Sequence, residues 1–434
     1  MFNRKKQDRE ESFDETSANE SSKETDDFLS KVGNFFNPEP QKEKVLRHED
    51  FNRAGDPYYA TVFVGYKISQ RILVLLLVVF LVFSLATNFS NITYDNFFYM
   101  LKDLSAAANI DDAVYETLSY DSNTRHFFSL YRGGLTVVNP SNISVFTSTG
   151  RQTLKATSKF SSPCVVSSDK YFLIYDISGT TFSVYNSFSR IYTEKLEYPV
   201  TNAAFDEKGN FAIVTKDISH KSIVYLYDKN FKPLAMIPEG EYAFDVALSY
   251  EYNKIAIAYY GIGDGSGRTK IVIRDRDNIK EEFSSVDISG ELLLDSKFID
   301  GGKYAVITDR AIHVYDVHLE EIEYYDYSGG TVSGYYIGEY GIAVSYTSNS
   351  RNYVIVFDKS GNLLYNETIN ENVKDICAYD GFVFLRTDTG VVRMHLKSGE
   401  SEYLGSGQGK MLVYNAETVL VCGDSKAEYL VFTD

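Results

Sequence analysis

The sequence predicts an all-β protein, an eight-bladed β-propeller carried on a single N-terminal transmembrane helix. From about Tyr120 onward, short alternating strands are separated by turns, and a four-strand unit recurs about every 40 residues, which is typical of propellers. Tyr and Phe number 35 and 29, a bias that favours strands. One long apolar run precedes the repeat, and we expect it to anchor the chain in a membrane.

The N-terminal tail, residues 1–66, is rich in charged and poor in large apolar side chains, which predicts disorder. Within it, five apolar residues at helical spacing predict a short amphipathic helix near 26–37, which would dock on a cytosolic protein or the inner leaflet. The alternative is a transient helix weakened by Gly33 and Asn34. The candidate docking residues are Phe28, Leu29, Val32, Phe35 and Phe36.

The apolar run from Ile72 to Ala86 is interrupted only by Ser84 and predicts a transmembrane helix over residues 67–89. The run alone covers about 22 Å of a hydrocarbon core roughly 30 Å thick, so we expect the helix to extend on both sides. Its distance from the N-terminus indicates an uncleaved anchor and not a signal peptide. The residues expected in the membrane include Arg71, which would extend its charge to the headgroups, and Ile72, Leu76, Phe80, Phe83 and Ala86.

The charges that flank this run predict its orientation. Arg53, Lys67 and Arg71 lie on the N-terminal side, whereas Asp95 and Asp103 follow with only one lysine between them. The positive-inside rule therefore predicts a cytoplasmic N-terminus and an extracellular propeller in the cell membrane. Residues 90–110 again follow helical spacing, and we expect a juxtamembrane helix that packs as a spacer or lies on the outer leaflet.

The repeat is clearest between Val200 and Ile237, where four apolar segments occur and the turn Asp206-Glu-Lys-Gly-Asn joins the first two. Eight third strands at intervals of about 40 residues predict eight blades. The longest interval contains Gly261–Gly267, which we expect to be a flexible hairpin of the fourth blade; an anion site, or a cation site through Asp264, is the alternative. The predicted third-strand ends are Phe146, Tyr185, Tyr227, Arg274, Tyr315, Phe357, His395 and Phe432.

The last unit has three strands and no fourth. The segment 113–118, ahead of the first blade, is a spare strand of suitable length, and we expect it to complete the eighth blade. The propeller domain would then occupy residues 111–434 with both ends in one sheet, which removes an edge that invites aggregation. Seven blades with a stray hairpin is the alternative.

Composition and motifs argue against several function classes. The 434 residues include 60 acidic and 43 basic side chains, and the net charge of −17 has the wrong sign for a nucleic-acid binder. Three cysteines supply neither a disulfide scaffold nor a multi-cysteine zinc site, and we expect buried free thiols. No histidine pair has metal-ligand spacing, and no nucleophile elbow, P-loop or dinucleotide fingerprint occurs. We therefore expect no metal, no cofactor and no enzymatic activity.

One acidic and tyrosine-rich stretch lies on the predicted outermost strand of the fifth blade. Tyrosine is enriched at protein interfaces, so this edge would bind a basic partner. The alternative is a solvated strand whose charges protect the sheet edge. The candidate partner-binding residues are Glu320, Glu321, Glu323, Tyr324, Tyr325, Asp326 and Tyr327.

Four segments carry a resemblance to a known family: Phe98-Tyr-Met-Leu-Lys-Asp-Leu104, Leu130-Tyr-Arg-Gly-Gly-Leu135, Val166-Ser-Ser-Asp-Lys-Tyr171 and Tyr185-Asn-Ser-Phe-Ser-Arg190. From the anchor to the C-terminus, the chain resembles membrane-anchored β-propeller proteins of unknown function from anaerobic Gram-positive bacteria. The resemblance implies architecture and compartment but no activity. More distantly, the blades are similar to pyrroloquinoline-quinone-type and envelope-assembly scaffold propellers. The Trp docking motifs of the quinone enzymes are absent, since the chain contains no tryptophan.

These observations predict a single-pass, membrane-anchored propeller that acts as a protein-interaction scaffold in the cell envelope. The helix would contact the lipid bilayer, the propeller would bind another envelope or membrane protein, and the tail would engage a cytosolic protein. The alternative is a propeller that senses a ligand or glycan, or acts as an enzyme, through its central channel. A fold alone does not decide between them.

Overall fold

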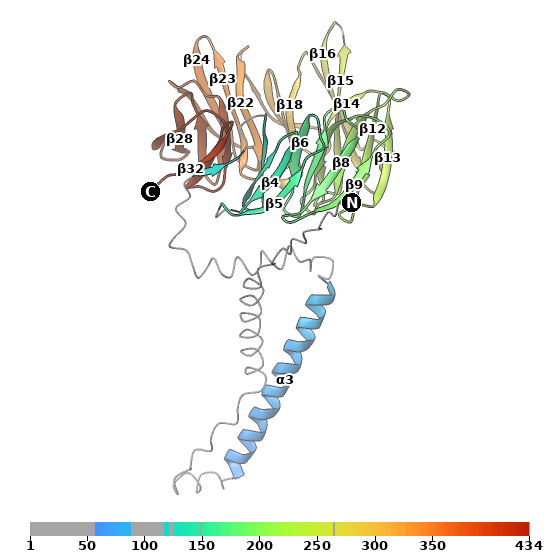
Figure 1. Ribbon diagram of the computed structural model, residues 1–434, viewed down its shortest axis with the longest axis vertical. Coiled ribbons are helices and arrows are strands. Elements are labelled where there is room, and N and C mark those ends of the chain that lie inside the picture. Colours follow the sequence, from blue (N-terminus) through green and yellow to red (C-terminus); the bar gives the residue numbers. More distant parts are fainter. Residues whose placement is uncertain are drawn as a thin grey trace, which may run out of the picture. The chain divides into compact units, whose positions relative to one another are not determined.

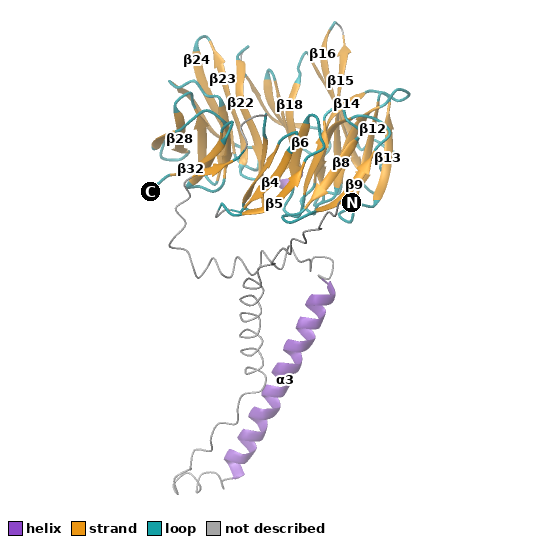
Figure 2. Cartoon of the chain, in the orientation of Figure 1, coloured by secondary structure: helices purple, strands orange, loops and turns teal. Residues whose placement is uncertain are grey.

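The computed structural model describes residues 57–87, 117–120, 125–147, 150–263, 265–327 and 329–433. The chain divides into two compact units between Thr93 and Tyr94. The described part of the first unit is one helix, α3 (Pro57–Thr87), whereas that of the second consists almost entirely of strands (Figures 1 and 2). The predicted tail helix near 26–37 and the predicted juxtamembrane helix over 90–110 lie outside the described residues.

Helix α3 begins and ends earlier than the predicted span of 67–89. Its first residue, Pro57, suits the first turn of a helix, because the N–H that proline lacks would have no partner there. Between Tyr66 and Phe83 the helix is apolar and none of it is buried within the described structure. By length and composition, this segment could cross a membrane.

The second unit is an eight-bladed β-propeller, which confirms the predicted fold. It contains eight separate four-stranded sheets, and within each sheet neighbouring strands are antiparallel. Blades one to four consist of β2 (Phe127–Tyr131), β3 (Gly134–Val138), β4 (Asn142–Phe146) and β5 (Gln152–Thr157); β6 (Pro163–Ser167), β7 (Phe172–Asp176), β8 (Thr181–Tyr185) and β9 (Arg190–Lys195); β10 (Val200–Phe205), β11 (Phe211–Lys216), β12 (Ser222–Tyr227) and β13 (Pro233–Glu239); and β14 (Tyr242–Ser249), β15 (Lys254–Gly263), β16 (Ser266–Asp275) and β17 (Ser284–Ser289).

Blades five to eight continue in the same order, with a short 3-10 helix, η2 (Asp300–Gly302), inside blade five. The predicted third-strand ends agree with the structure to within one residue. The strands are β18 (Leu293–Ile299), β19 (Lys303–Thr308), β20 (Ala311–Tyr315) and β21 (Glu321–Asp326); β22 (Thr331–Gly338), β23 (Gly341–Ser348), β24 (Arg351–Phe357) and β25 (Leu363–Ile369); β26 (Asp375–Tyr379), β27 (Phe382–Arg386), β28 (Gly390–His395) and β29 (Ser401–Gly405); and β30 (Lys410–Val413), β31 (Thr418–Cys422), β32 (Lys426–Val431) and β1 (Thr117–Ser119).

The ring closes in blade eight, where β1 is the fourth strand. It pairs antiparallel with β32, and Leu118 lies opposite Ala427. Just after it, the Tyr120 hydroxyl donates to the Gly423 carbonyl at 2.7 Å. The predicted closing strand, 113–118, overlaps β1 at its last two residues, and residues 113–116 lie outside the described part of the chain. Eight blades closed in this way exclude the seven-bladed alternative.

The core of the propeller lies between neighbouring blades. Both faces of each blade pack against a neighbour, so the second and third strands are mostly apolar and buried on both sides; in β20 every residue is buried. Outermost strands such as β9 alternate between exposed and half-buried residues. One cluster joins Val224 and Leu226 of blade three to Val246 and Ile257 of blade four, and similar clusters continue around the ring.

The predicted turn at Asp206 forms as its sequence indicates. The Asp206 carboxylate accepts hydrogen bonds from the backbone N–H groups of Lys208 and Asn210, each at 2.9 Å. Gly209 adopts a φ of +86°, a conformation that glycine adopts at little cost. The turn after the third strand repeats the same device, with an aspartate accepting two backbone bonds at Asp228, Asp316 and Asp358.

Alternating strand direction distributes the turns over two faces of the propeller. We call the face at which the innermost strands begin the start face; it carries the connections between blades and the turns between second and third strands. The opposite, end face carries the other turns. The two longest strands, β15 and β16, form a hairpin that projects from the start face, at the top of Figure 1.

Candidate functional site

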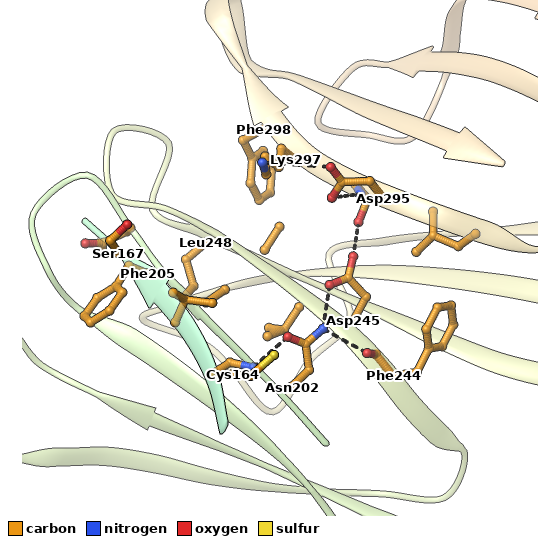
Figure 3. Close-up of a pocket in the computed structure, with 18 of the residues that line it drawn as sticks. Cys164, Ser167, Asn202, Phe205, Phe244, Asp245, Leu248, Asp295, Lys297 and Phe298 are labelled. Atoms are coloured by element: carbon orange, nitrogen blue, oxygen red, sulfur yellow. Dashed lines mark hydrogen bonds and ion pairs between the residues drawn. The ribbon is translucent and has the colours of Figure 1, made fainter. Parts of the chain in front are cut away.

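A cavity of about 950 Å³ occupies the central channel of the propeller. Innermost strands of blades one to six contribute its walls, since β2, β6, β10, β14, β18 and β22 each place at least one side chain there. Figure 3 shows its polar side chains, which include Asn202, Asp245, Asp295 and Lys297 beside Cys164. The volume falls in the range of small-molecule sites, about 300–1,000 Å³.

Asp245 is the centre of a hydrogen-bond network that crosses three blades. Its Oδ1 accepts a hydrogen bond from Asn202 Nδ2 of blade three at 2.9 Å, and its Oδ2 accepts one from Ser296 Oγ of blade five at 2.7 Å (Figure 3). The Tyr304 hydroxyl in turn donates to Ser296 Oγ at 2.7 Å. Burial in protein, and then the nearby negative charge of Asp295, raise the pKa of Asp245 to about 6.

A β-bulge near the start of the innermost strand explains how these side chains reach the channel. In blades three to six, one extra residue interrupts the pairing between the first and second strands; these residues are Thr201, Phe244, Leu294 and Ser333. A bulge bends the strand and changes the direction of the next side chain. In three of the four blades, that next residue is an asparagine or aspartate: Asn202, Asp245 and Asp295.

The sequence analysis did not identify this recurring polar position, although the sequence contains a pattern that marks it. Each of these residues follows an apolar residue by two positions, as in Val200-Thr-Asn202 and Leu293-Leu-Asp295, and blade seven repeats the pattern in Val373-Lys-Asp375. The side chains of Asn202, Asp295 and Asp375 each accept a hydrogen bond from the backbone N–H of the following residue. The asparagine or aspartate at this position therefore forms a hydrogen bond with the adjacent backbone and also supplies a polar side chain.

The channel can bind a polar ligand that both donates and accepts hydrogen bonds. A carboxyl group with a pKa of about 6 changes its protonation near physiological pH. A cation lies nearby, because Lys297 Nζ is 3.9 Å from Asp295 Oδ2 and donates to the Ile337 carbonyl at 2.8 Å. Within the described residues, no group of three or more His, Cys, Asp and Glu side chains is arranged to hold a metal ion.

A second hollow, of about 430 Å³, opens on the start face, and we call it the start-face groove. Tyr242, Tyr260 and Leu292 form its exposed apolar walls. Phe244 and Leu293 belong to both the groove and the channel, so the two hollows adjoin. The remaining lining residues are Thr201, Lys216, Ser222 and Ala243.

Most of the predicted partner-binding stretch lies on β21, the outermost strand of blade five; Glu320 precedes this strand and Tyr327 follows it. The side chains of Glu320, Glu321, Glu323, Tyr324 and Asp326 are exposed there, and Tyr325 is half-buried. Tyr327 is a correction to the prediction, because it is 0% exposed and packs against Ile337 and Tyr346 of blade six. It follows the end of β21, where the chain turns inward to begin the next blade, so it cannot contact a partner.

A buried histidine lies behind this strand. His313 Nδ1 is 2.8 Å from Glu321 Oε1 of β21, and its Nε2 is 3.0 Å from Glu291 Oε2 in the connection before blade five. Burial alone would lower the pKa of His313, but the hydrogen bonds to the two glutamates raise it above its usual value. The arrangement joins the outer strand of blade five to the connection from blade four.

The predicted membrane residues lie on α3. Arg71, Ile72, Leu76, Phe80 and Phe83 are all exposed, as expected of side chains that no described protein segment covers, and Ala86 lies in the last turn. The predicted docking residues of the tail, Phe28 to Phe36, lie outside the described residues. The three cysteines are free thiols; Cys377 and Cys422 are buried, and Cys164 is partly exposed.

Comparisons with known proteins identify the family and the fold. Residues 111–428 match the model of a "Family of unknown function (DUF5711)". The structure is similar to Sqt1 of Saccharomyces cerevisiae, with a TM-score of 0.55 and 8% identity over 73% of this chain and 98% of that chain. It is also similar to a structure described as the eukaryotic initiation factor, with a TM-score of 0.51 and 11% identity over 72% and 85%. At such identities the likeness shows the fold alone, and no curated protein matches the sequence.

Proposed function

The chain belongs to the DUF5711 family of unknown function, and from that premise we propose that it is a single-pass membrane protein whose extracellular propeller is an interaction scaffold of the cell envelope. In this proposal the propeller binds another envelope or membrane protein and has no enzymatic activity. The tail, on the cytoplasmic side, engages a cytosolic protein.

One observation carries the proposal: exposed apolar side chains gather on the start face of blades three to five. Ile218, in the turn between β11 and β12, is 93% exposed, and Ile262, near the end of β15, is 78% exposed. On the same face, Tyr242, Tyr260 and Leu292 line one groove. Single apolar residues are common on protein surfaces, but a contiguous patch is typical of an interaction site.

The outer strand of blade five is a second candidate contact of the scaffold. Glu323, Tyr324 and Asp326 present two carboxylates and an aromatic ring on an exposed sheet edge. Such an edge suits a basic partner. In the variant Glu323→Lys with Asp326→Lys, a partner that uses this edge is lost, whereas one that uses the start face is retained.

The membrane part of the proposal depends on α3 and its flanking charges. Lys67 and Arg71 lie toward the N-terminal side of the apolar segment, which favours a cytoplasmic N-terminus. The test is labelling of one introduced cysteine at a time with a membrane-impermeant maleimide, in a Cys164→Ser background in which the remaining Cys377 and Cys422 are buried. We expect Asn372→Cys to react in intact cells and Ser12→Cys only after lysis. The reverse pattern would place the propeller in the cytoplasm and overturn the envelope assignment.

A second candidate function is binding of an extracellular small molecule or glycan in the central channel. The cavity of about 950 Å³ with Asp245 in its wall favours it. The two candidates are separated by in-cell crosslinking of the tagged full-length chain, followed by mass spectrometry. A near-stoichiometric envelope protein, lost when residues 120–434 are deleted and retained when residues 1–50 are deleted, supports the scaffold. Recovery of the chain alone, together with a thermal shift by a small ligand that Asp245→Ala abolishes, supports the channel.

A further inference from the structure

The start-face groove is bounded by three successive blades. Lys216 at the end of β11 lies on the side of blade three, Tyr242 and Tyr260 come from blade four, and Leu292 precedes blade five. Gly267 lets Leu292 approach the hairpin, since a Cβ at this glycine would lie 3.1 Å from Leu292 Cδ2. The groove is therefore lined by apolar side chains from blade four and from the connection to blade five, and by the cation of Lys216 on the side of blade three.

Next to the groove, beyond Tyr260, one edge of β15 has no neighbour among the described strands. The pairing of β14 with β15 begins at Tyr242 opposite Tyr260, whereas β15 continues to Gly263. From Gly261 to Gly263, β15 is paired only with β16 among the described strands. An exposed edge of this kind accepts an extended segment through main-chain hydrogen bonds, while side-chain pockets select its residues. Ile262, in the middle of this edge, is largely exposed.

The charged side chain that lines the groove is a cation, that of Lys216, although the chain as a whole carries −17. Lys216 is exposed, and Lys221 Nζ lies 5.5 Å from the centre of the Tyr242 ring. Neither lysine forms an ion pair with a carboxylate of the described residues. The nearby Asp217 carboxylate is occupied by His220, 2.9 Å away. On the other side of the hairpin, Arg268 pairs with Glu241 and Asp287, and Lys270 pairs with Glu241.

We propose that the start-face groove binds an extended, acidic segment of a partner protein, which inserts one large apolar side chain between Tyr242, Tyr260 and Leu292. The segment pairs along the edge of β15 at Ile262, and its carboxylates meet Lys216 and Lys221. This inference rests on the proposed scaffold function and names the surface and chemistry of its partner. A concave groove suits a side chain better than a bilayer, so a protein segment and not a membrane is the occupant.

The test uses the full-length protein in nanodiscs of neutral lipid, panned against a displayed library of random heptapeptides. We expect the enriched peptides to combine Asp or Glu with Phe, Leu or Ile. In fluorescence anisotropy, we expect the Lys216→Glu, Lys221→Glu double variant to weaken an enriched peptide at least fivefold, and Leu292→Asp to weaken it at least tenfold. These residues are exposed, so the variants are expected to keep the wild-type thermal midpoint.

Matched controls repeat each change on another blade. Lys155→Glu with Lys195→Glu reverses two exposed charges on outer strands, and Met236→Asp places the same acid on an exposed apolar edge. We expect each control to alter the affinity less than twofold. Enrichment of basic peptides, or no enrichment at all, would overturn the proposal. An equal loss of peptide affinity in the control variants would also overturn it. So would displacement of the peptide from the wild type by vesicles of anionic lipid, at lipid concentrations that leave the peptide bound to the control variants.

A photo-crosslinking residue separates this proposal from the scaffold function itself. In cells it replaces Tyr260 in one variant and Tyr403, an exposed residue of blade seven, in another. Crosslinking of the scaffold partner at Tyr260 alone, combined with the peptide preference above, supports the groove. Crosslinking at Tyr403 and not at Tyr260 overturns the groove but leaves the scaffold standing. Recovery of no partner from the full-length chain by any route overturns both.

Discussion

Arg276 Nη1 donates to Asp206 Oδ2 at 2.6 Å and so joins the end faces of blades four and three. The Asp206 side chain is 0% exposed and that of Arg276 is 9% exposed, so water screens this ion pair little. The same carboxylate also holds the backbone of its own turn. One aspartate therefore shapes the turn of one blade and fixes the position of the next.

The first prediction concerns this ion pair. Arg276→Ala leaves a buried carboxylate without its cation, and we expect the free energy of unfolding to fall by about 3 kcal/mol. Urea denaturation of the propeller measures it. Arg268→Ala is the control, because its pair with Glu241 is partly exposed and is expected to contribute at most about 1 kcal/mol. Equal losses in the two variants would contradict the role assigned to Asp206.

The second prediction follows from the pKa of Asp245, which is about 6 in the folded protein and about 3.9 in the unfolded chain. Folding therefore favours the protonated form, and this contribution is fully present below about pH 4 and is lost as the pH rises through 6. Between pH 4 and pH 7, we expect the stability of Asp245→Asn relative to the wild type to rise by about 2 kcal/mol. Urea denaturation midpoints of the two proteins, measured over this pH range, test this change. Parallel pH profiles of the two proteins would refute the prediction. The control is Asp287→Asn, at an exposed aspartate.

The third prediction concerns His313, whose side chain is 6% exposed between Glu291 and Glu321. Its pKa is raised in the folded state, so its contribution to stability is fully present below about pH 6.5 and is lost as the pH rises through the folded value. Glu291 has a lowered pKa, and its contribution is lost only as the pH falls below the usual glutamate range. We expect the stability advantage of the wild type over His313→Gln to be larger at pH 6 than at pH 9; His318→Gln, at an exposed histidine, is the control. Thermal midpoints at the two pH values decide it.

The fourth prediction tests ring closure by β1. Leu118 is buried against Leu135 of blade one and Leu420 of blade eight. Leu118→Ala removes this contact, and we expect a loss of about 2–3 kcal/mol in the free energy of unfolding. Thr117→Ala, on the exposed side of the same strand, is expected to change it by less than about 0.5 kcal/mol. If the two substitutions have the same effect in urea denaturation, β1 does not hold the ring closed.

Much of the fold was predictable because propeller strands carry a local signal. The second and third strands of each blade are buried on both faces, so segments such as Phe211-Ala-Ile-Val and Tyr304-Ala-Val-Ile307 consist of apolar and aromatic residues. Their recurrence at a nearly constant interval predicted the number of blades. The closing strand was predictable because one blade lacked a fourth strand and one spare strand existed.

The channel was harder to predict, because a single extra residue decides which face of a strand a side chain occupies. Strict alternation from Val200 would place Asn202 on the same face as Val200, and the bulge at Thr201 breaks that alternation. The recurring asparagine or aspartate was visible in the sequence, but its direction was not. Tyr327 illustrates the opposite error: it continues an exposed pattern in sequence, yet the chain turns inward just before it.

The sequence by itself determined the apolar helix, the eight repeats and the strand that closes them, because hydrophobic periodicity and turn residues act over a few neighbouring positions. Only the tertiary structure decided which side chains meet. Asp245 finds Asn202 and Ser296, each more than 40 residues away, and the start-face groove combines three blades. Such contacts depend on bulges, register and the closure of the ring, which are properties of the whole sheet assembly and not of any one segment.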